Sequence, residues 1–171
     1  MRQVGNMEKV CAIVLAAGDG KRMRSSRPKV LCEVLFRPMI CWIAGVLEEC
    51  GVRDICAVLG TGADQVHAAV PRFSWVEQKE RLGTGHAVMQ AKAFLQEHRG
   101  GDCAVLYGDT PLMDADTLQK AYLLHKKEGA AVTLVTASLP DPAGYGRIVR
   151  NEKGDVSGIV EQADADEKTL Q

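Results

Sequence analysis

The sequence predicts an α/β protein with three layers, in which helices cover both faces of a mostly parallel sheet. Three observations support this fold class. Short apolar runs alternate along the chain with segments of helical period. Loops rich in glycine and charge follow several of those runs, which is typical of parallel strands that end beside a ligand. The chain has 171 residues, 46% of them hydrophobic and 25% charged, which suits a domain with a sizeable core.

The first half of the chain contains three predicted strands and two predicted helices. The strands are expected at 10–15, 54–59 and 73–76, and the helices at 38–50 and 63–70. The first helix has Pro38 at its start and Gly51 after its end, which is the usual placement of these residues. Its residues Ile40, Ile43 and Leu47 recur at helical spacing, so one face is apolar.

The second half continues the alternation and ends in a hairpin. A loop at 78–85 precedes a helix at 86–98, a strand at 103–106 and a helix that runs to about Glu128. Asp114 and Asp116 can cap that last helix. The segment 131–139 is β-rich, and 147–149 with 156–160 is expected to form a hairpin around 151–154.

Composition excludes several classes of function. The net charge is −1, so we expect no broad basic face for nucleic acid. No apolar run reaches the ~18 residues of a membrane span, and the polar leader at 1–9 lacks the apolar core of a signal peptide. The six cysteines show no C-x-x-C spacing, which argues against zinc and favours reduced thiols in the cytoplasm.

The loop from Leu15 to Lys29 has the composition of a polyphosphate site. It reads LAAGDGKRMRSSRPK, with small residues, two glycines and five cations directly after an apolar strand. Small residues let the backbone approach a ligand, and exposed N–H groups in such a turn bind anions. It is not a Walker A loop, because Arg22 follows Gly20-Lys21, and it lacks the third glycine of a dinucleotide fingerprint.

Four ordered motifs carry a family resemblance. They are LAAGxGxRM followed by PKVL, Gln78 with LGTGHA at 82–87, LYGDTPL at 106–112, and DPxGYGRI at 141–148. Together they resemble the sugar-1-phosphate nucleotidyltransferases, most closely the uridyltransferase half of the bifunctional branch that also carries an acetyltransferase. The resemblance implies a Rossmann-like nucleotidyltransferase fold over 10–171, incomplete at its C-terminus, with the acetyltransferase β-helix absent.

The resemblance also implies a set of site residues. The catalytic residues would be Arg22, Lys29 and Asp109, with Asp109 as the ligand of Mg²⁺. The nucleotide would contact Leu15, Ala16, Ala17, Gly18, Lys29, Gln78, Gly83, Thr84, Tyr107 and Gly108. The sugar would contact Gly146 and Glu161.

Elementary chemistry is consistent with three of these roles. A carboxylate that follows a strand and a glycine, as Asp109 does, can hold Mg²⁺ together with substrate phosphates. Arg22 and Lys29 supply the positive charge on which phosphoryl-type transfer depends. The amide of Gln78 offers two donors and an acceptor, which match the edge of uracil.

The function expected from the resemblance is Mg²⁺-dependent transfer of a uridylyl group from UTP to N-acetylglucosamine 1-phosphate. We expect no nucleic-acid or membrane partner, and a homo-oligomer is possible. Three alternatives stay open. The first is a fragment that binds UTP or a UDP-sugar without turnover. The second is a thymidylyl- or glucose-specific relative. The third is an NAD-dependent oxidoreductase, which the missing glycine disfavours.

Overall fold

The computed structural model describes residues 7, 9–18, 20 and 27–170. The chain forms two compact units, Met1–Thr133 and Leu134–Gln171, and the division falls inside the segment expected to be one domain. Met7, within the expected leader, is only 1% exposed, and its N–H donates to the carbonyl of Cys50. No helix in the described part of the chain has the length and apolarity that crossing a membrane would require.

The first unit is built on a four-stranded parallel sheet in the order β5-β4-β1-β6. Its strands are β1 (Val10–Ala16), β4 (Ile55–Leu59), β5 (Ser74–Glu77) and β6 (Asp102–Tyr107). Every residue of β1 and of β4 is buried, whereas β5 and β6 lie at the edges and are partly exposed. This burial explains why the two central strands are continuous apolar runs rather than alternating ones.

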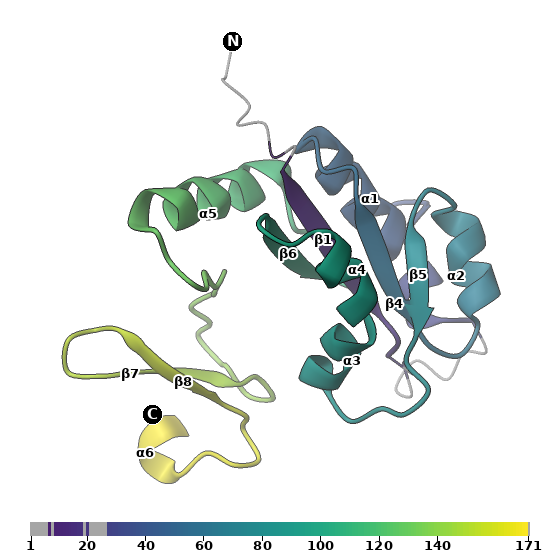
Figure 1. The fold of residues 1–171 in the computed structure, drawn as a ribbon. Helices are drawn as coiled ribbons and strands as arrows, with labels where there is room; N and C mark the ends of the chain where they lie inside the picture. Colours follow the sequence, from purple (N-terminus) through teal and green to yellow (C-terminus); the bar gives the residue numbers. More distant parts are fainter. Residues whose placement is uncertain (1–6, 8, 19, 21–26, 171) are drawn as a thin grey trace. The chain divides into compact units, whose positions relative to one another are not determined.

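Helices cover both faces of this sheet, as the sequence predicts (Figure 1). One face packs against α1 (Met39–Glu49), α2 (Ala63–Ala69) and α5 (Ala115–Glu128), and its core includes Val14, Ile43 and Leu118. The other face packs against α3 (Thr84–Gln90) and α4 (Lys92–Glu97), and its core includes Ile13 and Val58. Alternate residues of β1 therefore serve two separate cores.

The order of the strands creates a switch point in the middle of the sheet. The chain runs from β1 outward to β4 and β5, then crosses to the other side of β1 to form β6. In such sheets ligands bind beyond the carboxyl ends of the strands, at the place where the direction of winding reverses. That place lies between the ends of β1 and β6.

Two predicted elements differ from those observed. The helix expected at 86–98 starts two residues earlier, at Thr84, and is divided into α3 and α4 by Ala91. The segment 131–139 is not a strand, although its composition is β-rich. The physical reason is that a strand needs a hydrogen-bonded neighbour, and this segment pairs with none of the described strands.

A short hairpin between β1 and α1 is not predicted by the sequence. Its strands are β2 (Glu33–Val34) and β3 (Arg37–Pro38), and they follow a 3₁₀ turn at Lys29–Leu31. The two turn residues, Leu35 and Phe36, have φ values of 51° and 62°. Such left-handed conformations are normally filled by Gly or Asn, so a Leu-Phe pair gives no turn signal.

The second unit is a hairpin followed by one helical turn. Strands β7 (Arg147–Arg150) and β8 (Val156–Val160) pair antiparallel, and α6 covers Glu167–Leu170. The side chain of Asn151 accepts hydrogen bonds from the N–H groups of Lys153 and Asp155, which closes the turn. This agrees with the hairpin expected from the sequence.

Candidate functional site

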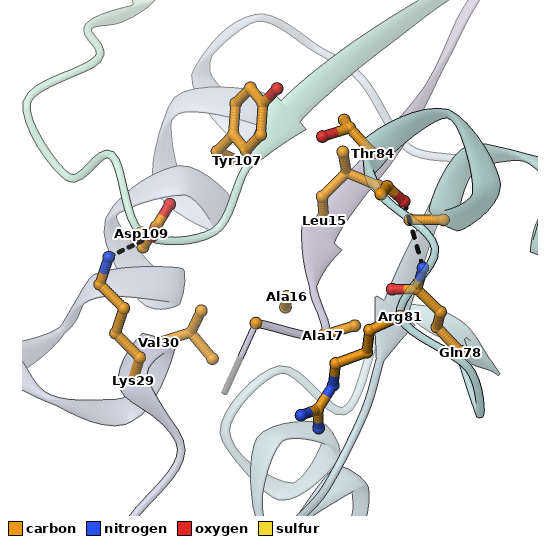
Figure 2. A pocket seen from close by; sticks show the side chains of 13 residues that line it. Leu15, Ala16, Ala17, Lys29, Val30, Gln78, Arg81, Thr84, Tyr107 and Asp109 are labelled. Carbon is orange, nitrogen blue, oxygen red and sulfur yellow. Dashed lines mark hydrogen bonds and ion pairs between the residues drawn. The ribbon is translucent and has the colours of Figure 1, made fainter. Parts of the chain in front are cut away.

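A cavity of about 280 Å³ opens at the carboxyl ends of the strands, beside the switch point. Three of the stretches singled out in the sequence meet there: the end of β1, the loop before α3, and the end of β6 (Figure 2). The lining residues are Leu15, Ala16, Ala17, Gly18, Lys29, Val30, Gln78, Arg81, Gly83, Thr84, Ala87, Tyr107 and Asp109. Each nucleotide-binding residue expected from the resemblance lines this cavity, except Gly108.

Gly108 instead holds two walls of the cavity together. Its N–H donates to the carbonyl of Leu15 over 2.9 Å, which ties the end of β6 to the end of β1. A Cβ added at Gly108 would lie 3.2 Å from Val30 Cγ1 and 3.3 Å from the Leu15 carbonyl oxygen. Only glycine fits this close approach comfortably.

Gln78 is the buried polar side chain of the described core, with 6% of its surface exposed. Its Nε2 donates to the carbonyl of Gly83 over 3.2 Å and lies 3.1 Å from Nδ1 of His86. Both contacts use the nitrogen of the amide, and Figure 2 shows the oxygen turned away from the dashed bond to Gly83. The amide is therefore held with its acceptor available for a ligand that carries a hydrogen-bond donor.

His86 contributes to the site through Gln78. Its Nδ1 lies 3.1 Å from Nε2 of Gln78, and its Nε2 lies 3.1 Å from Nε2 of Gln90, so the ring is held between two amide side chains. The sequence shows His86 within a motif but gives it no chemical role. Its half-buried ring on α3, three residues after Gly83, fixes the orientation of the glutamine.

Gly83 begins α3 in a backbone conformation that needs glycine. Its φ of 97° and ψ of 179° lie in a region that residues with a Cβ rarely enter. The carbonyl of Gly83 accepts from the N–H of Ala87 and from the side chain of Gln78. This one peptide group therefore connects the start of the helix to the loop that follows β5.

Lys29 and Asp109 form an ion pair on the wall opposite Gln78 (Figure 2). Lys29 Nζ donates to Asp109 Oδ2 over 2.6 Å, and the two side chains are 35% and 30% exposed. Lys29 is positioned by the 3₁₀ turn at Lys29–Leu31, because its neighbours Val30 and Leu31 are buried in the core. Asp109 is positioned by β6, which ends two residues before it.

The residues at this wall fit a magnesium ion held jointly with a substrate. Mg²⁺ is usually bound by one or two carboxylates together with phosphate oxygens and water. Among the lining residues described, Asp109 is the carboxylate that can serve. In the described part of the chain, no three His, Cys, Asp or Glu side chains are grouped so as to hold a metal by themselves. The donor set therefore matches a shared site rather than a closed protein cage.

Arg81, Val30 and Ala87 line the cavity although none of them is among the site residues expected from the resemblance. Val30 and Ala87 are apolar wall residues whose burial no local pattern reveals. Arg81 donates from its guanidinium to the hydroxyl of Thr61 over 3.0 Å, which holds it beside the loop that follows β4. Its position inside the charged loop between Gln78 and Gly83 is the signal that could have identified it.

Besides Gly108, three expected site residues are not among the lining residues described. Arg22 lies outside the described residues. Gly146 and Glu161 belong to the second unit, where they flank the open end of the β7–β8 hairpin. A Cβ added at Gly146 would lie 3.5 Å from Glu161 Oε2, so the hairpin brings these two residues together.

Comparison with known proteins gives close relatives by sequence. The chain is 47% identical to the bifunctional protein GlmU of Heliobacterium modesticaldum over 163 residues, which cover 95% of this chain and 35% of that protein. It is 48% identical to the bifunctional protein GlmU of Brevibacillus brevis over 162 residues, which cover 94% and 35%. The chain thus spans about a third of the length of these curated relatives.

Solved structures and a family model agree with the fold. A UDP-glucose pyrophosphorylase complexed with UDP-glucose superimposes with a TM-score of 0.69 at 21% identity, over 91% of this chain and 69% of that chain. At this identity the likeness concerns the fold. The model of the MobA-like NTP transferase domain matches residues 12–158, a range that begins within β1 and ends within β8. With most of its length inside that match, the chain belongs to the MobA-like NTP transferase domain family.

Proposed function

We propose that this chain transfers a uridylyl group from UTP to N-acetylglucosamine 1-phosphate in the presence of Mg²⁺, giving UDP-N-acetylglucosamine and pyrophosphate. The observation that carries the proposal is the convergence of the end of β1, Gln78, Lys29 and Asp109 on one cavity at the switch point. The similarity to the GlmU proteins supports the same reaction class.

The base would bind at the Gln78 end of the cavity. The amide nitrogen of Gln78 is already committed to Gly83 and His86, so its oxygen remains as an acceptor. Uracil carries an N–H donor on its pairing edge, whereas cytosine presents an acceptor at the same position. This difference favours UTP over CTP, because a wrong base would leave a buried acceptor without a partner.

The phosphates would bind at the Lys29 and Asp109 end. An oxygen of the sugar phosphate attacks the α-phosphorus of UTP, a new P–O bond forms, and the bond to the β-phosphate oxygen breaks to release pyrophosphate. Lys29 would stabilise the negative charge that develops on the phosphates, and Asp109 would hold the metal. The metal ion, when bound, neutralises phosphate charge and orients the two reacting groups.

The wall of the cavity that the end of β1 forms suits this chemistry. Leu15, Ala16 and Ala17 are buried with small or apolar side chains, so the backbone and not a bulky group faces the ligand. Catalysis of this type depends on positioning and electrostatics rather than on a covalent enzyme intermediate. No nucleophile and base are brought together among the lining residues described.

The experiment that tests the proposal is pyrophosphate release by the 171-residue chain. We expect release only when UTP, Mg²⁺ and N-acetylglucosamine 1-phosphate are all present. Replacing UTP by CTP or thymidine triphosphate should reduce it, and glucose 1-phosphate tests the choice of sugar. Release that does not need the sugar phosphate would contradict the reaction proposed.

A parallel binding measurement separates the alternatives. Thermal stabilisation by UTP without any pyrophosphate release would identify a nucleotide-binding module that lacks turnover. Stabilisation by NAD and not by UTP would contradict both the reaction and the nucleotide assigned to the cavity. Preference for thymidine triphosphate or glucose 1-phosphate would keep the reaction class and change the substrate.

A further inference from the structure

Two cysteines stand directly opposite one another on neighbouring strands of the main sheet. The parallel register of β1 and β6 pairs Cys11 with Cys103. Both side chains point to the face of the sheet that also carries Ile13 and Val105, since they are separated from these residues by two positions along each strand. Neither cysteine lines the cavity described above.

The two thiols interact with each other. Burial is the largest cause of the raised pKa of both Cys11 and Cys103, and each thiol also influences the ionisation of the other. Cys11 is only 3% exposed, whereas Cys103 is on the edge strand and is exposed. The pair thus combines one thiol that solvent can reach with one that is held behind it.

The geometry points to a dithiol that closes to a disulfide: we propose that Cys11 and Cys103 are oxidised to an intramolecular disulfide by a hydroperoxide. Neighbouring strands are about 4.7–4.9 Å apart, and disulfides join residues whose Cα atoms are about 4.4–6.8 Å apart. Residues in register on adjacent strands therefore fall within the range of Cα separations that disulfides join.

The reaction balances with hydrogen peroxide as the oxidant. The sulfur of Cys103 attacks one peroxide oxygen, the O–O bond breaks, one water leaves and a sulfenic acid remains on Cys103. The sulfur of Cys11 then attacks the sulfenic sulfur, the S–S bond forms, and a second water leaves. Two thiols lose two protons and two electrons in total, and the peroxide is reduced to two waters.

Cys56 is the nearest competitor and is less well placed. It lies on β4, on the other side of β1, and the register sets it opposite Ile13 rather than Cys11. The diagonal offset increases its separation from Cys11, and it is buried, so an oxidant has no direct route to it. The structure therefore selects Cys11 with Cys103 rather than Cys11 with Cys56.

The two reduced thiols react slowly with oxidants at neutral pH. Burial raises the pKa of Cys11 and, as the largest cause, raises the pKa of Cys103 to about 12. At neutral pH both sulfurs are therefore protonated, and thiolates rather than thiols are the nucleophiles. Oxidation should be slower than for an ordinary exposed cysteine and should still favour the disulfide, because Cys11 stands in register with Cys103 on the neighbouring strand.

The bond would fasten the edge strand to the centre of the sheet. Within the sheet described, β6 pairs only with β1, so its attachment depends on that single ladder. The disulfide would join β1, which carries Leu15 of the cavity, to β6, which ends two residues before Asp109. It would also constrain the unfolded chain, which raises stability.

The test is peptide mapping of the chain before and after treatment with hydrogen peroxide, with free thiols blocked before digestion. We expect a linked pair of peptides containing Cys11 and Cys103, lighter by two hydrogen atoms than the separate peptides. We also expect the midpoint of thermal unfolding to rise by roughly 5–10 °C, and dithiothreitol to reverse both changes.

Variants make the outcome decisive. Cys103→Ser changes an exposed residue, should fold normally, and should abolish both the linked peptide and the thermal shift. Cys32→Ser, away from the pair, should leave both unchanged. A link from Cys103 to another chain, a Cys11–Cys56 link, or sulfinic acid on Cys103 without a link would overturn the proposal.

Discussion

Replacing Asp109 by Asn should separate the function of this carboxylate from its contribution to stability. Asn has nearly the same shape, so the change removes the charge and the metal affinity while it keeps the packing. Asp109 is the carboxylate among the lining residues described, so the variant leaves a metal there without an anionic protein ligand. We expect pyrophosphate release to fall at least about 100-fold, which corresponds to ~2.7 kcal/mol of transition-state stabilisation.

The effect of the same change on folding should be small. The ion pair with Lys29 is short, at 2.6 Å, but both side chains are about one third exposed, and solvent weakens the attraction. Exposed pairs of this kind contribute about 0.2–1 kcal/mol to the free energy of unfolding. We therefore expect Asp109→Asn to lower that free energy by no more than about 1 kcal/mol.

The assay pairs pyrophosphate release with urea unfolding, and Asp116→Asn is the matched control. Asp116 also lies 2.6 Å from a lysine, Lys120, but on the exposed surface of α5 and away from the cavity. It should cost at most a similar free energy and leave activity unchanged. Undiminished turnover in Asp109→Asn, or a loss of stability well above 1 kcal/mol, would refute the reasoning. If the chain binds UTP without turnover, the readout is instead the difference between the UTP affinities measured with and without Mg²⁺, which Asp109→Asn should reduce.

Four further changes test other parts of the structure. Gly60→Ala would place a Cβ 2.8 Å from the Ala17 carbonyl oxygen, so it should destabilise the fold by about 1–3 kcal/mol in urea unfolding. Phe36→Gly relieves a left-handed φ of 62° at a side chain that is 97% exposed, and should stabilise by about 1 kcal/mol in the same assay. Arg81→Ala removes a cation from the cavity wall and should raise the KM for UTP about 3–10-fold with little change in kcat, measured by steady-state kinetics. Asp114→Ala removes the N-cap of α5. The hydrogen bond that the Asp114 carboxylate accepts from the backbone N–H of Thr117 lowers the pKa of this carboxyl in the folded state. The stabilisation by the cap is therefore complete above the ordinary Asp pKa of 3.8 and is lost as the pH falls through the lower folded pKa.

Each of these changes has a control or a contradicting result. Gly85→Ala adds a Cβ with no atom within 4 Å inside a helix and should be neutral or stabilising. Phe36→Ala keeps the left-handed strain and should not stabilise. Arg99→Ala, exposed and outside the cavity, should leave the KM unchanged. The stability difference between the wild type and Asp114→Ala should shrink in acid, and a difference that stays constant with pH would contradict the capping role.

Much of the fold could be predicted because its central strands are buried on both faces. Burial of β1 and β4 forces continuous apolar runs, and a single sequence displays these clearly. The cap at Asp114 was also visible, because a side-chain acceptor before an amphipathic run is a local signal. The location of the cavity could also be predicted, since parallel strands bring their carboxyl ends together at one edge of the sheet.

The rest could not be predicted because it depends on tertiary contacts. Nothing local shows that Gly83 adopts a φ of 97° and starts α3 before His86. The Leu35-Phe36 turn violates the usual residue preference, so the hairpin around it is set by its surroundings. Arg81 lies in a charged loop, but its place beside the cavity depends on Thr61, twenty positions away in sequence, whose hydroxyl accepts a hydrogen bond from it.

In the proposed reaction, the ion pair between Lys29 and Asp109 would make the binding of the metal and the binding of the nucleotide interdependent. Mg²⁺ would need the carboxylate and a phosphate would need the ammonium group, so either ligand would have to separate the same two side chains. The ligand that binds first bears the free-energy cost of breaking the ion pair. The ligand that binds second then finds its side chain already free of that pair. Thermodynamic linkage then requires each ligand to strengthen the other by the same factor. For a pair contributing about 0.2–1 kcal/mol, that factor is roughly 1.4–5, before any direct attraction between metal and phosphate is added.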